Sequence, residues 1–226
     1  MKRRLEYLFI LVLVMVSMMI NSATAGAATP EIKKSRVIYT LKDVNGEKYK
    51  IYIIGTNEKN KIATWDDVWA AVSYKDVLYT GNYKIYTQKV GSKKIIDTGF
   101  QYKEYMYNVT KKTIYSLPSK YKGQPDILSI AEREASIYES TDMFIIYKGK
   151  LKMVRHDFGY YLRPMSIGKN SFQTADYDNV DLLWTINNFS YNSSKATLIR
   201  TKSKSFPYND KADVNRYIKN WKKSWM

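Results

Sequence analysis

The sequence predicts an all-β fold, built as an antiparallel sandwich or as open propeller-like sheets, with a C-terminal α-helix. Three observations lead to this prediction. Short runs rich in β-branched and aromatic residues recur along the chain, glycine-containing turns separate them, and residues 207–226 change to a helical spacing of apolar side chains. With 226 residues, 45% hydrophobic residues and no cysteine, the chain is long enough to fold around a core without disulfides.

The N-terminal segment is predicted to be a signal peptide that covers residues 1–25. Residues 2–4 are basic, an apolar run of about 13 residues follows at 8–20, and small residues come next. This run is shorter than the roughly 20 residues that span a bilayer as a helix, which favours cleavage over the alternative of an uncleaved anchor. We therefore expect a secreted, extracellular protein in which residues 26–35 form a linker.

Three hairpins are predicted in the β domain, which covers residues 36–206. Each pairs two apolar, β-branched runs through a short turn that contains glycine. The turns are Asn45-Gly46, Gly91-Ser92 and Gly149-Lys150, which join residues 36–41 to 47–54, 83–90 to 93–100, and 144–148 to 151–154. Further strand candidates lie at residues 102–109, 127–131, 180–186 and 196–201. Strands at this spacing are typical of sandwiches and of propeller-like sheets.

Two segments carry helical signals. Thr64 followed by Asp66 and Asp67 is typical of a helix N-cap with an acidic first turn, but the segment up to Val72 fits a strand equally well. In residues 207–226, apolar side chains recur at helical spacing and cations occupy the other positions. This amphipathic helix is expected either to dock on the β core or to make a peripheral contact with a membrane or an anionic polymer.

Several short motifs resemble secreted bacterial proteins with FG-GAP or VCBS-type β repeats. A Gly-Asp turn precedes a D-I-L strand at residues 123–130, an I-Y run precedes a K-L hairpin at 144–151, and residues 43–46 are similar to the opening turn of another unit. This resemblance spans residues 36–154 and implies blade-like four-stranded sheets with extracellular adhesion or binding roles. The chain departs from the family at the calcium turn, where carboxylates are few, so no cofactor is expected.

The charge balance indicates where such a protein is retained. Lysine and arginine number 37 against 21 acidic residues, and removal of residues 1–25 leaves 34 against 20, a net charge of +14. This charge attracts anionic cell-wall polymer, and export argues against nucleic acid as a partner. We expect non-catalytic binding of an anionic wall polymer, a glycan or a protein partner at the bacterial envelope. A secreted toxin or antagonist also fits the chain, and the oligomeric state is not predicted.

Tyrosines beside lysines are the candidate binding residues. Exposed tyrosine rings stack on sugars, and neighbouring lysines hold anionic groups; the alternative is that these tyrosines simply pack in the sheets. The representative candidates are Lys84, Tyr86, Lys103, Tyr105 and Trp221.

A secreted hydrolase acting on wall or extracellular polymer is the alternative function. Glu132 and Glu134 would share one strand face, and glycoside hydrolysis needs two carboxylates. His156 is the one histidine of the chain and a candidate general base. Asp157 follows it, but adjacent strand residues point to opposite faces, so Asp157 is poorly placed to orient the imidazole. With no cysteine and one histidine, no metal site is expected.

Overall fold

The computed structural model describes residues 31–69, 71–133, 138–210, 212–213 and 216. The chain divides into two units, Met1–Glu31 and Ile32–Met226, and the fold is that of the second unit. The predicted signal peptide lies outside the described residues, as do residues 26–30 of the predicted linker and most of the predicted C-terminal helix.

The described residues form an all-β fold of three antiparallel four-stranded sheets, which confirms the all-β part of the predicted fold class. The first sheet contains β1 (Ser35–Lys42), β2 (Lys48–Ile62), β3 (Val77–Lys89) and β4 (Ile96–Asn108). The second contains β5 (Ile114–Leu117), β6 (Ile127–Arg133), β7 (Glu139–Tyr147) and β8 (Lys150–Arg155). The third contains β9 (Leu162–Gly168), β10 (Ser171–Asp178), β11 (Leu183–Asn192) and β12 (Thr197–Pro207).

Each sheet is a meander in which strands adjacent in sequence are paired. The three predicted hairpins are confirmed as β1–β2, β3–β4 and β7–β8. At the first turn Gly46 has a φ of 83°, and at the third Lys148 and Gly149 have φ values of 49° and 77°. At the third turn, two successive positive φ values match the twist of an antiparallel hairpin. Glycine adopts such a φ without steric cost, which explains its place in both turns.

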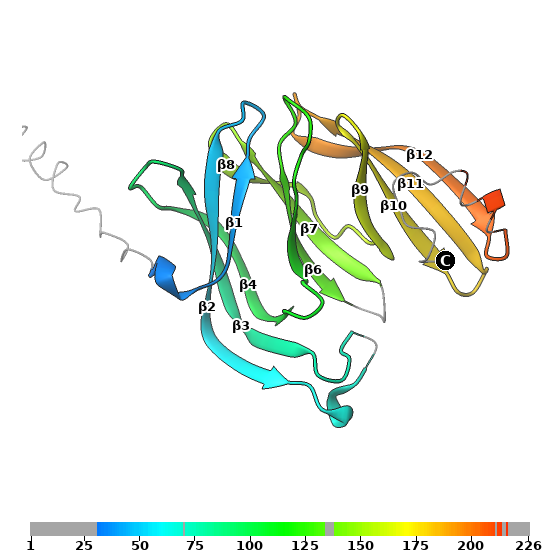
Figure 1. The fold of residues 1–226 in the computed structure, drawn as a ribbon, viewed down its shortest axis with the longest axis horizontal. Helices are drawn as coiled ribbons and strands as arrows, with labels where there is room; N and C mark the ends of the chain where they lie inside the picture. The colour runs from blue at the N-terminus through cyan, green and yellow to red at the C-terminus, as the bar shows by residue number, and fades with distance from the viewer. Residues whose placement is uncertain (1–30, 70, 134–137, 211, 214–215, 217–226) are drawn as a thin grey trace, which may run out of the picture. The chain divides into compact units, whose positions relative to one another are not determined.

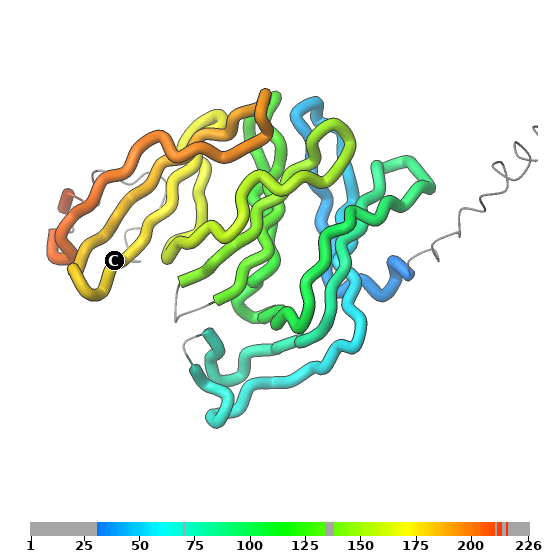
Figure 2. Tube along the Cα trace, turned by 180° about the vertical axis from the view of Figure 1, so that it is seen from behind, coloured from blue at the N-terminus to red at the C-terminus, as the bar shows by residue number. Residues whose placement is uncertain are grey.

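The second sheet lies between the other two, as Figures 1 and 2 show by its green colour between blue-cyan and yellow-orange strands. Strand β7 explains this arrangement because successive side chains alternate between its faces. Phe144 and Ile146 pack in a core shared with the first sheet. Met143 and Ile145 pack in a core shared with the third sheet. An uninterrupted apolar run is thus buried on both faces, as in strands covered from two sides.

Several expectations require correction. The segment from Thr64 to Val72 forms neither a regular helix nor a strand but a short 3-10 turn at Trp65–Asp67, closed by a capping box. The predicted C-terminal helix is not supported: β12 continues to Pro207, and most of the residues after it lie outside the described residues. Strands β5, β9 and β10 were not predicted from the sequence. Among the described residues, no helix has the length and apolar character needed to cross a bilayer.

Candidate functional site

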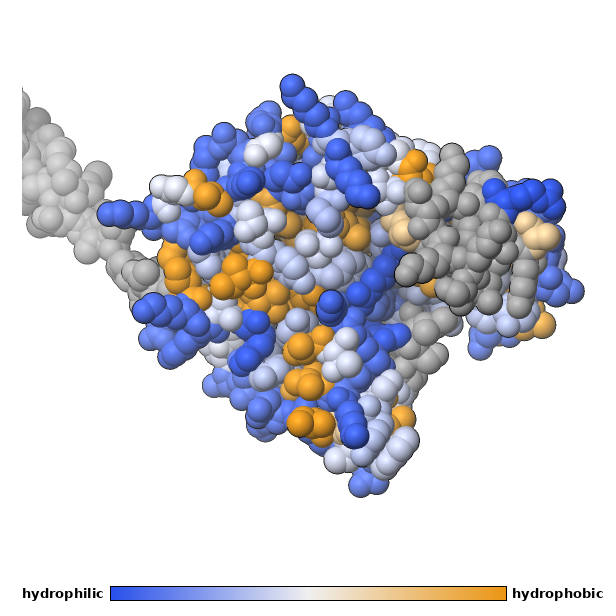
Figure 3. Space-filling view, in the orientation of Figure 1, coloured by the Kyte–Doolittle hydropathy of each residue, from blue (hydrophilic) through white to orange (hydrophobic). Residues whose placement is uncertain are grey.

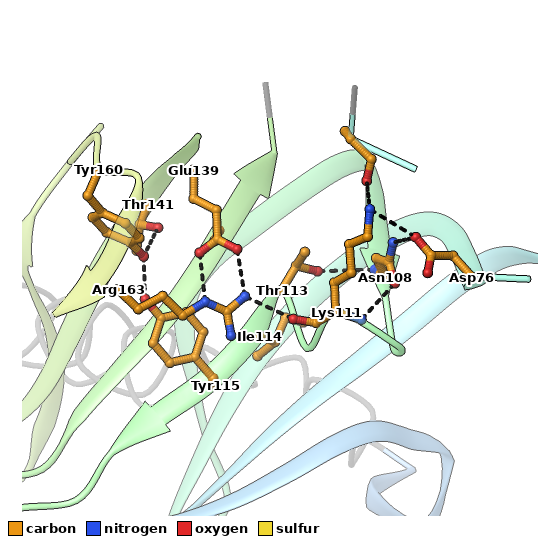
Figure 4. A network of polar contacts seen from close by, with 12 residues as sticks. Asp76, Asn108, Lys111, Thr113, Ile114, Tyr115, Glu139, Thr141, Tyr160 and Arg163 are labelled. Atoms are coloured by element: carbon orange, nitrogen blue, oxygen red, sulfur yellow. Dashed lines mark hydrogen bonds and ion pairs between the residues drawn. The ribbon is translucent and has the colours of Figure 1, made fainter. Parts of the chain in front are cut away.

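A buried ion pair joins the second and third sheets. Arg163 on β9 donates two hydrogen bonds to the Glu139 carboxylate, from Nε at 2.9 Å and from Nη2 at 2.6 Å. Its guanidinium also lies 4.3 Å from the centre of the Tyr115 ring. The hydroxyl of Tyr160 hydrogen-bonds to those of Tyr115 and Thr141, so the network continues into the second sheet (Figure 4). A bidentate charged pair of this kind orients both partners strongly.

The same network reaches the first sheet through the turn after β4. Arg163 Nη2 donates to the carbonyl oxygen of Lys111 at 2.9 Å. The Lys111 ammonium lies 3.2 Å from the Asp76 carboxylate, which also accepts a 2.7 Å hydrogen bond from Asn108 (Figure 4). Because these groups bond mainly to each other and the two carboxylates are nearly inaccessible, the network serves the fold rather than a ligand.

The third sheet has one face that changes from apolar to polar along its strands. Directly opposite residues of antiparallel strands share a face, and Phe172 is opposite Phe189 in the core against the second sheet. Two and four residues further along β10 the same face carries Thr174, opposite Asn187, and then Asp176. Burying polar groups on an inward sheet face lowers stability unless those groups form hydrogen bonds. A ligand could supply such bonds, so this polar stretch of the third sheet is a candidate binding surface.

A groove of ≈ 890 Å³ opens beside this polar face. Its volume lies in the range of small-molecule and saccharide pockets. Its floor includes Asn187, which is 3% exposed and whose Oδ1 atom has no hydrogen-bond partner among the described residues. Arg155 and Arg200 are exposed cations at its edges. The other lining residues are Tyr138, Asp157, Phe158, Gly159, Asp176, Tyr177, Asp178, Asn179, Thr185 and Phe189.

Asp176 is the electrostatically unusual group of the groove. Burial raises the pKa of its carboxyl from 3.8 to about 6, and the hydrogen bond from Asn187 Nδ2 at 2.7 Å opposes that rise only in part. This bond also fixes the amide orientation, with Nδ2 toward Asp176 and Oδ1 left as a free acceptor. A desolvated carboxylate in a cleft is typical of functional sites.

A second, smaller pocket of ≈ 260 Å³ has His156, whose side chain is 77% exposed, in its lining. His156 Nδ1 lies 2.6 Å from Asp142 Oδ1, and the Tyr102 hydroxyl donates to Asp142 Oδ2 at 2.7 Å. Glu132 and Ser140 also line this pocket, and Asp157 lines both it and the groove. The hydrogen bond and charge of Asp142 raise the pKa of His156 above its ordinary value. His156 and Asp157 lie in the bend after β8 and not in a strand, and the imidazole is oriented by Asp142 on β7 rather than by Asp157.

The pKa of His156 is a direct test of this pocket. We expect it above the ordinary value of 6.5 in the wild type and close to 6.5 in Asp142→Asn, because the substitution removes the negative charge next to Nδ1. Protonated His156 then stabilises the fold at pH below about 6.5, a contribution lost as the pH rises through the folded-state pKa. NMR titration of the one histidine measures both values. A pKa of His156 at or below 6.5 in the wild type would contradict the hydrogen bond between His156 and Asp142.

The predicted catalytic residues partly come together. Glu132 and His156 line one pocket, although they are 24 positions apart in the sequence. Glu134 lies outside the described residues, so its predicted pairing with Glu132 stays a prediction. Asp142 was not singled out, because its position beside His156 depends on the pairing of β7 with β8.

Three of the five predicted binding residues lie at the surface of the first sheet. Lys84 and Lys103 are exposed on the first sheet, Tyr86 is half-buried there, and Trp221 lies outside the described residues. Tyr105 was wrongly expected at the surface: it is 2% exposed, and its hydroxyl donates to the Ala131 carbonyl oxygen at 2.8 Å. Tyrosine alternation does not distinguish an inward ring from an outward one when both sheet faces carry tyrosine.

The turns compared with calcium loops use their carboxylates internally. Asp43 Oδ1 accepts the backbone N–H groups of Asn45 and Glu47 at 2.8 and 2.9 Å. Asp126 accepts those of Lys42 and Ser119 at 2.8 and 2.7 Å. Asp43 therefore caps its own turn in the first sheet, whereas Asp126 links β1 of the first sheet to the segment that precedes β6.

The groove residues carried no recognisable motif in the sequence. Asn187 and Asp176 belong to β11 and β10, and only strand register places them together. The Gly168–Asn170 turn, with Asn170 at a φ of 55°, was the local signal for the missed β9–β10 hairpin. The described part of the chain contains no cluster of three or more His, Cys, Asp and Glu side chains that could hold a metal ion. Comparisons of the chain with protein-family models, curated proteins and solved structures find no match.

Proposed function

We propose that this protein is a secreted, non-catalytic binding protein of the bacterial envelope, and that the groove beside the third sheet binds a glycan. The observation that carries the proposal is the buried amide of Asn187, whose Oδ1 has no partner and which lines the groove. A buried acceptor without a donor costs about 1–3 kcal/mol. The Oδ1 atom is itself covered from solvent, so a ligand hydroxyl reaches it when the side chains over the groove floor move, and its hydrogen bond then removes this cost.

The chemistry of the groove suits sugar hydroxyls, which both donate and accept hydrogen bonds. Asn187 Oδ1 and the Asp176 carboxylate are acceptors, and Arg155 and Arg200 are donors. Tyr138 adds an aromatic ring at the edge of the groove, and aromatic rings pack against the apolar faces of sugars. Because acidic residues line the groove together with the arginines, a polar saccharide fits it better than a bare polyanion.

Two further features support an envelope role. The predicted mature chain carries a net charge of +14, which favours retention by anionic wall polymer whatever the groove binds. The resemblance to FG-GAP and VCBS-type repeats implies four-stranded sheets in extracellular binding proteins, and this chain folds into three four-stranded meanders. In this proposal charge holds the protein near the wall and the groove selects the glycan.

Binding to isolated Gram-positive cell walls and to N-acetylglucosamine oligomers tests the proposal. We expect Asn187→Ala and Arg200→Gln each to weaken binding about tenfold at moderate salt, because each removes a hydrogen-bonding group from the groove. The matched control is Lys94→Gln, which removes the same charge from an exposed turn of the first sheet and should leave oligomer binding unchanged. Sedimentation with walls and calorimetry with oligomers measure the two affinities.

The groove is not the glycan-binding site if Arg200→Gln and Lys94→Gln lose the same amount of binding affinity and Asn187→Ala keeps the affinity of the wild type. Net charge alone would then account for wall binding. A thermal unfolding curve for each variant separates lost binding from lost folding.

The histidine pocket supports a second candidate function, a hydrolase acting on the same polymer. His156 is oriented by Asp142 through Nδ1, which is the arrangement of a general base, and Glu132 lies in the same pocket. His156→Gln and Glu132→Gln should leave glycan binding intact if the protein only binds. Release of reducing ends from wall glycan by the wild type, lost in these variants with folding unchanged, would favour the hydrolase instead.

A further inference from the structure

The connection between β2 and β3 exposes an unusual amount of apolar surface. This tip, residues 62–69 and 71–75, carries Ile62, Trp65 and Trp69 with exposed fractions of 66, 72 and 51%. Val68 and Tyr74 are exposed beside them. In Figure 3 hydrophobic surface (orange) gathers toward the lower end of the view, where β2 ends and β3 begins. Several large apolar side chains gathered at one exposed site usually mark an interaction surface.

These side chains are held in place by the tip itself. The Trp65 and Tyr74 rings stack with their centres 4.3 Å apart and an interplanar angle of 4°. Ala63 bonds through its backbone to Asp76 and Lys75, each at 2.8 Å. Below these bonds lies a small core of Ala63, Val72 and Leu78. Rings presented in a fixed arrangement lose little conformational entropy on binding.

The tip combines an apolar surface with cations. A shallow groove of ≈ 590 Å³ beside it has an apolar lining of Val68, Trp69, Val72, Leu78 and Met106. Its polar lining residues are Lys59, Lys61, Asp66, Asp67 and Thr80. Lys75 lies 5.2 Å from the Tyr74 ring centre on the other side of the tip. Of the acids, Asp67 is paired with Lys61 and Asp76 with Lys111, whereas Asp66 is exposed.

We propose that this tip docks on the surface of a lipid bilayer that contains anionic lipid. Tryptophan and tyrosine favour the interface between headgroups and acyl chains, and the aliphatic Ile62 and Val68 suit hydrocarbon but have no role in binding sugars. The lysines Lys59 and Lys75 match anionic headgroups, and the net positive charge of the chain attracts it to such a surface. Membrane contact is thereby assigned to a described segment rather than to residues 207–226, and it is independent of the glycan groove.

Co-sedimentation of the exported chain with vesicles tests this assignment. The vesicles contain equal parts of phosphatidylglycerol and phosphatidylcholine, and pure phosphatidylcholine vesicles serve as the comparison. We expect Trp69→Ser and Ile62→Ser each to lower the partition coefficient about tenfold, because each removes a large apolar group from the interface. Asp66→Asn should raise it several-fold, because the substitution removes a negative charge that faces the lipid.

The controls separate the tip from other apolar surface. Val180→Ser changes an even more exposed side chain, in the turn between β10 and β11, and Trp221→Ser changes the predicted C-terminal helix; neither should alter partitioning. A loss in Trp221→Ser with none in Trp69→Ser would overturn the proposal in favour of the C-terminal segment. Absence of wild-type binding to the anionic vesicles would also overturn it and leave a protein partner as the occupant of the tip. Glycan binding by the tip variants should be unchanged, so the two proposals fail separately.

Discussion

Asp176→Asn is expected to stabilise the protein at neutral pH by up to roughly 3 kcal/mol. The carboxyl pKa rises from 3.8 to about 6 in the folded state because burial disfavours the charged form, and a pKa difference of this size corresponds to that energy at pH well above 6. The asparagine carries no charge to desolvate and keeps an acceptor for Asn187 Nδ2. Urea denaturation at about pH 7.5 measures the gain in free energy of unfolding.

The sign of the effect follows from the direction of the shift. Asp176 binds its proton more tightly in the folded than in the unfolded state. The destabilisation that this carboxyl causes is therefore absent below about pH 4 and develops as the pH rises through 6. The gain from Asp176→Asn should therefore vanish at about pH 4. Asp178 is the matched control on the same strand: backbone N–H groups of Asp181 and Val180 lower its pKa, so Asp178→Asn should not stabilise the protein. Equal stability of Asp176→Asn and wild type at pH 7.5 would show that the groove floor is fully hydrated.

Stabilisation should be accompanied by weaker glycan binding. An ionised carboxylate accepts stronger hydrogen bonds from hydroxyl groups than a neutral amide does. A residue whose replacement improves the fold but impairs binding is typical of a functional site, where activity is retained at a cost in stability. The same variant thus tests the electrostatics of the groove by denaturation and its proposed function by calorimetry.

Glu139→Gln is expected to lower the free energy of unfolding by about 3 kcal/mol. The carboxylate is nearly inaccessible and holds Arg163 through two hydrogen bonds, so the substitution leaves a largely buried guanidinium without its counter-charge. This expected loss of stability lies at the low end of the losses found when one partner of a buried ion pair is removed, because a third of the Arg163 side chain remains exposed. Urea denaturation at neutral pH measures the loss.

Glu47→Gln is the control for this substitution. Glu47 pairs with Lys89 at the surface, where about half of each side chain is exposed, and such pairs contribute at most about 1 kcal/mol. A loss in Glu139→Gln no larger than that in Glu47→Gln would mean that water replaces the carboxylate at Arg163. Glycan binding should persist in folded Glu139→Gln, because neither Glu139 nor Arg163 lines the groove.

Much of the fold was predictable because its signals are local. Runs of β-branched and aromatic residues indicated the strands. The Asn45-Gly46 turn and Gly149 indicated where the chain reverses direction between paired strands. The prediction failed at β9 and β10, where the strands are poorer in β-branched residues. It also failed at Thr64, where a capping box that usually begins a helix closes a single 3-10 turn because Val68 already returns to an extended conformation.

The candidate site was less predictable than the fold. His156 and Glu132 were identified as chemically capable, but their common pocket, and the orientation of His156 by Asp142, result from strand pairing. Asn187 and Asp176 gave no signal, since polar residues in a β-strand are ordinary when one face is exposed to water. Their importance comes from the third sheet turning that face toward the second.

The sequence by itself determined the strand composition, the positions of the hairpin turns and the excess of positive charge, because each depends on neighbouring residues or on simple sums. Only the tertiary structure decided which face of each strand is buried. Strand periodicity divides side chains between two faces but does not say what covers either one. For that reason Tyr105, expected at the surface, lies in the core, while Asn187 lies buried at the floor of the groove.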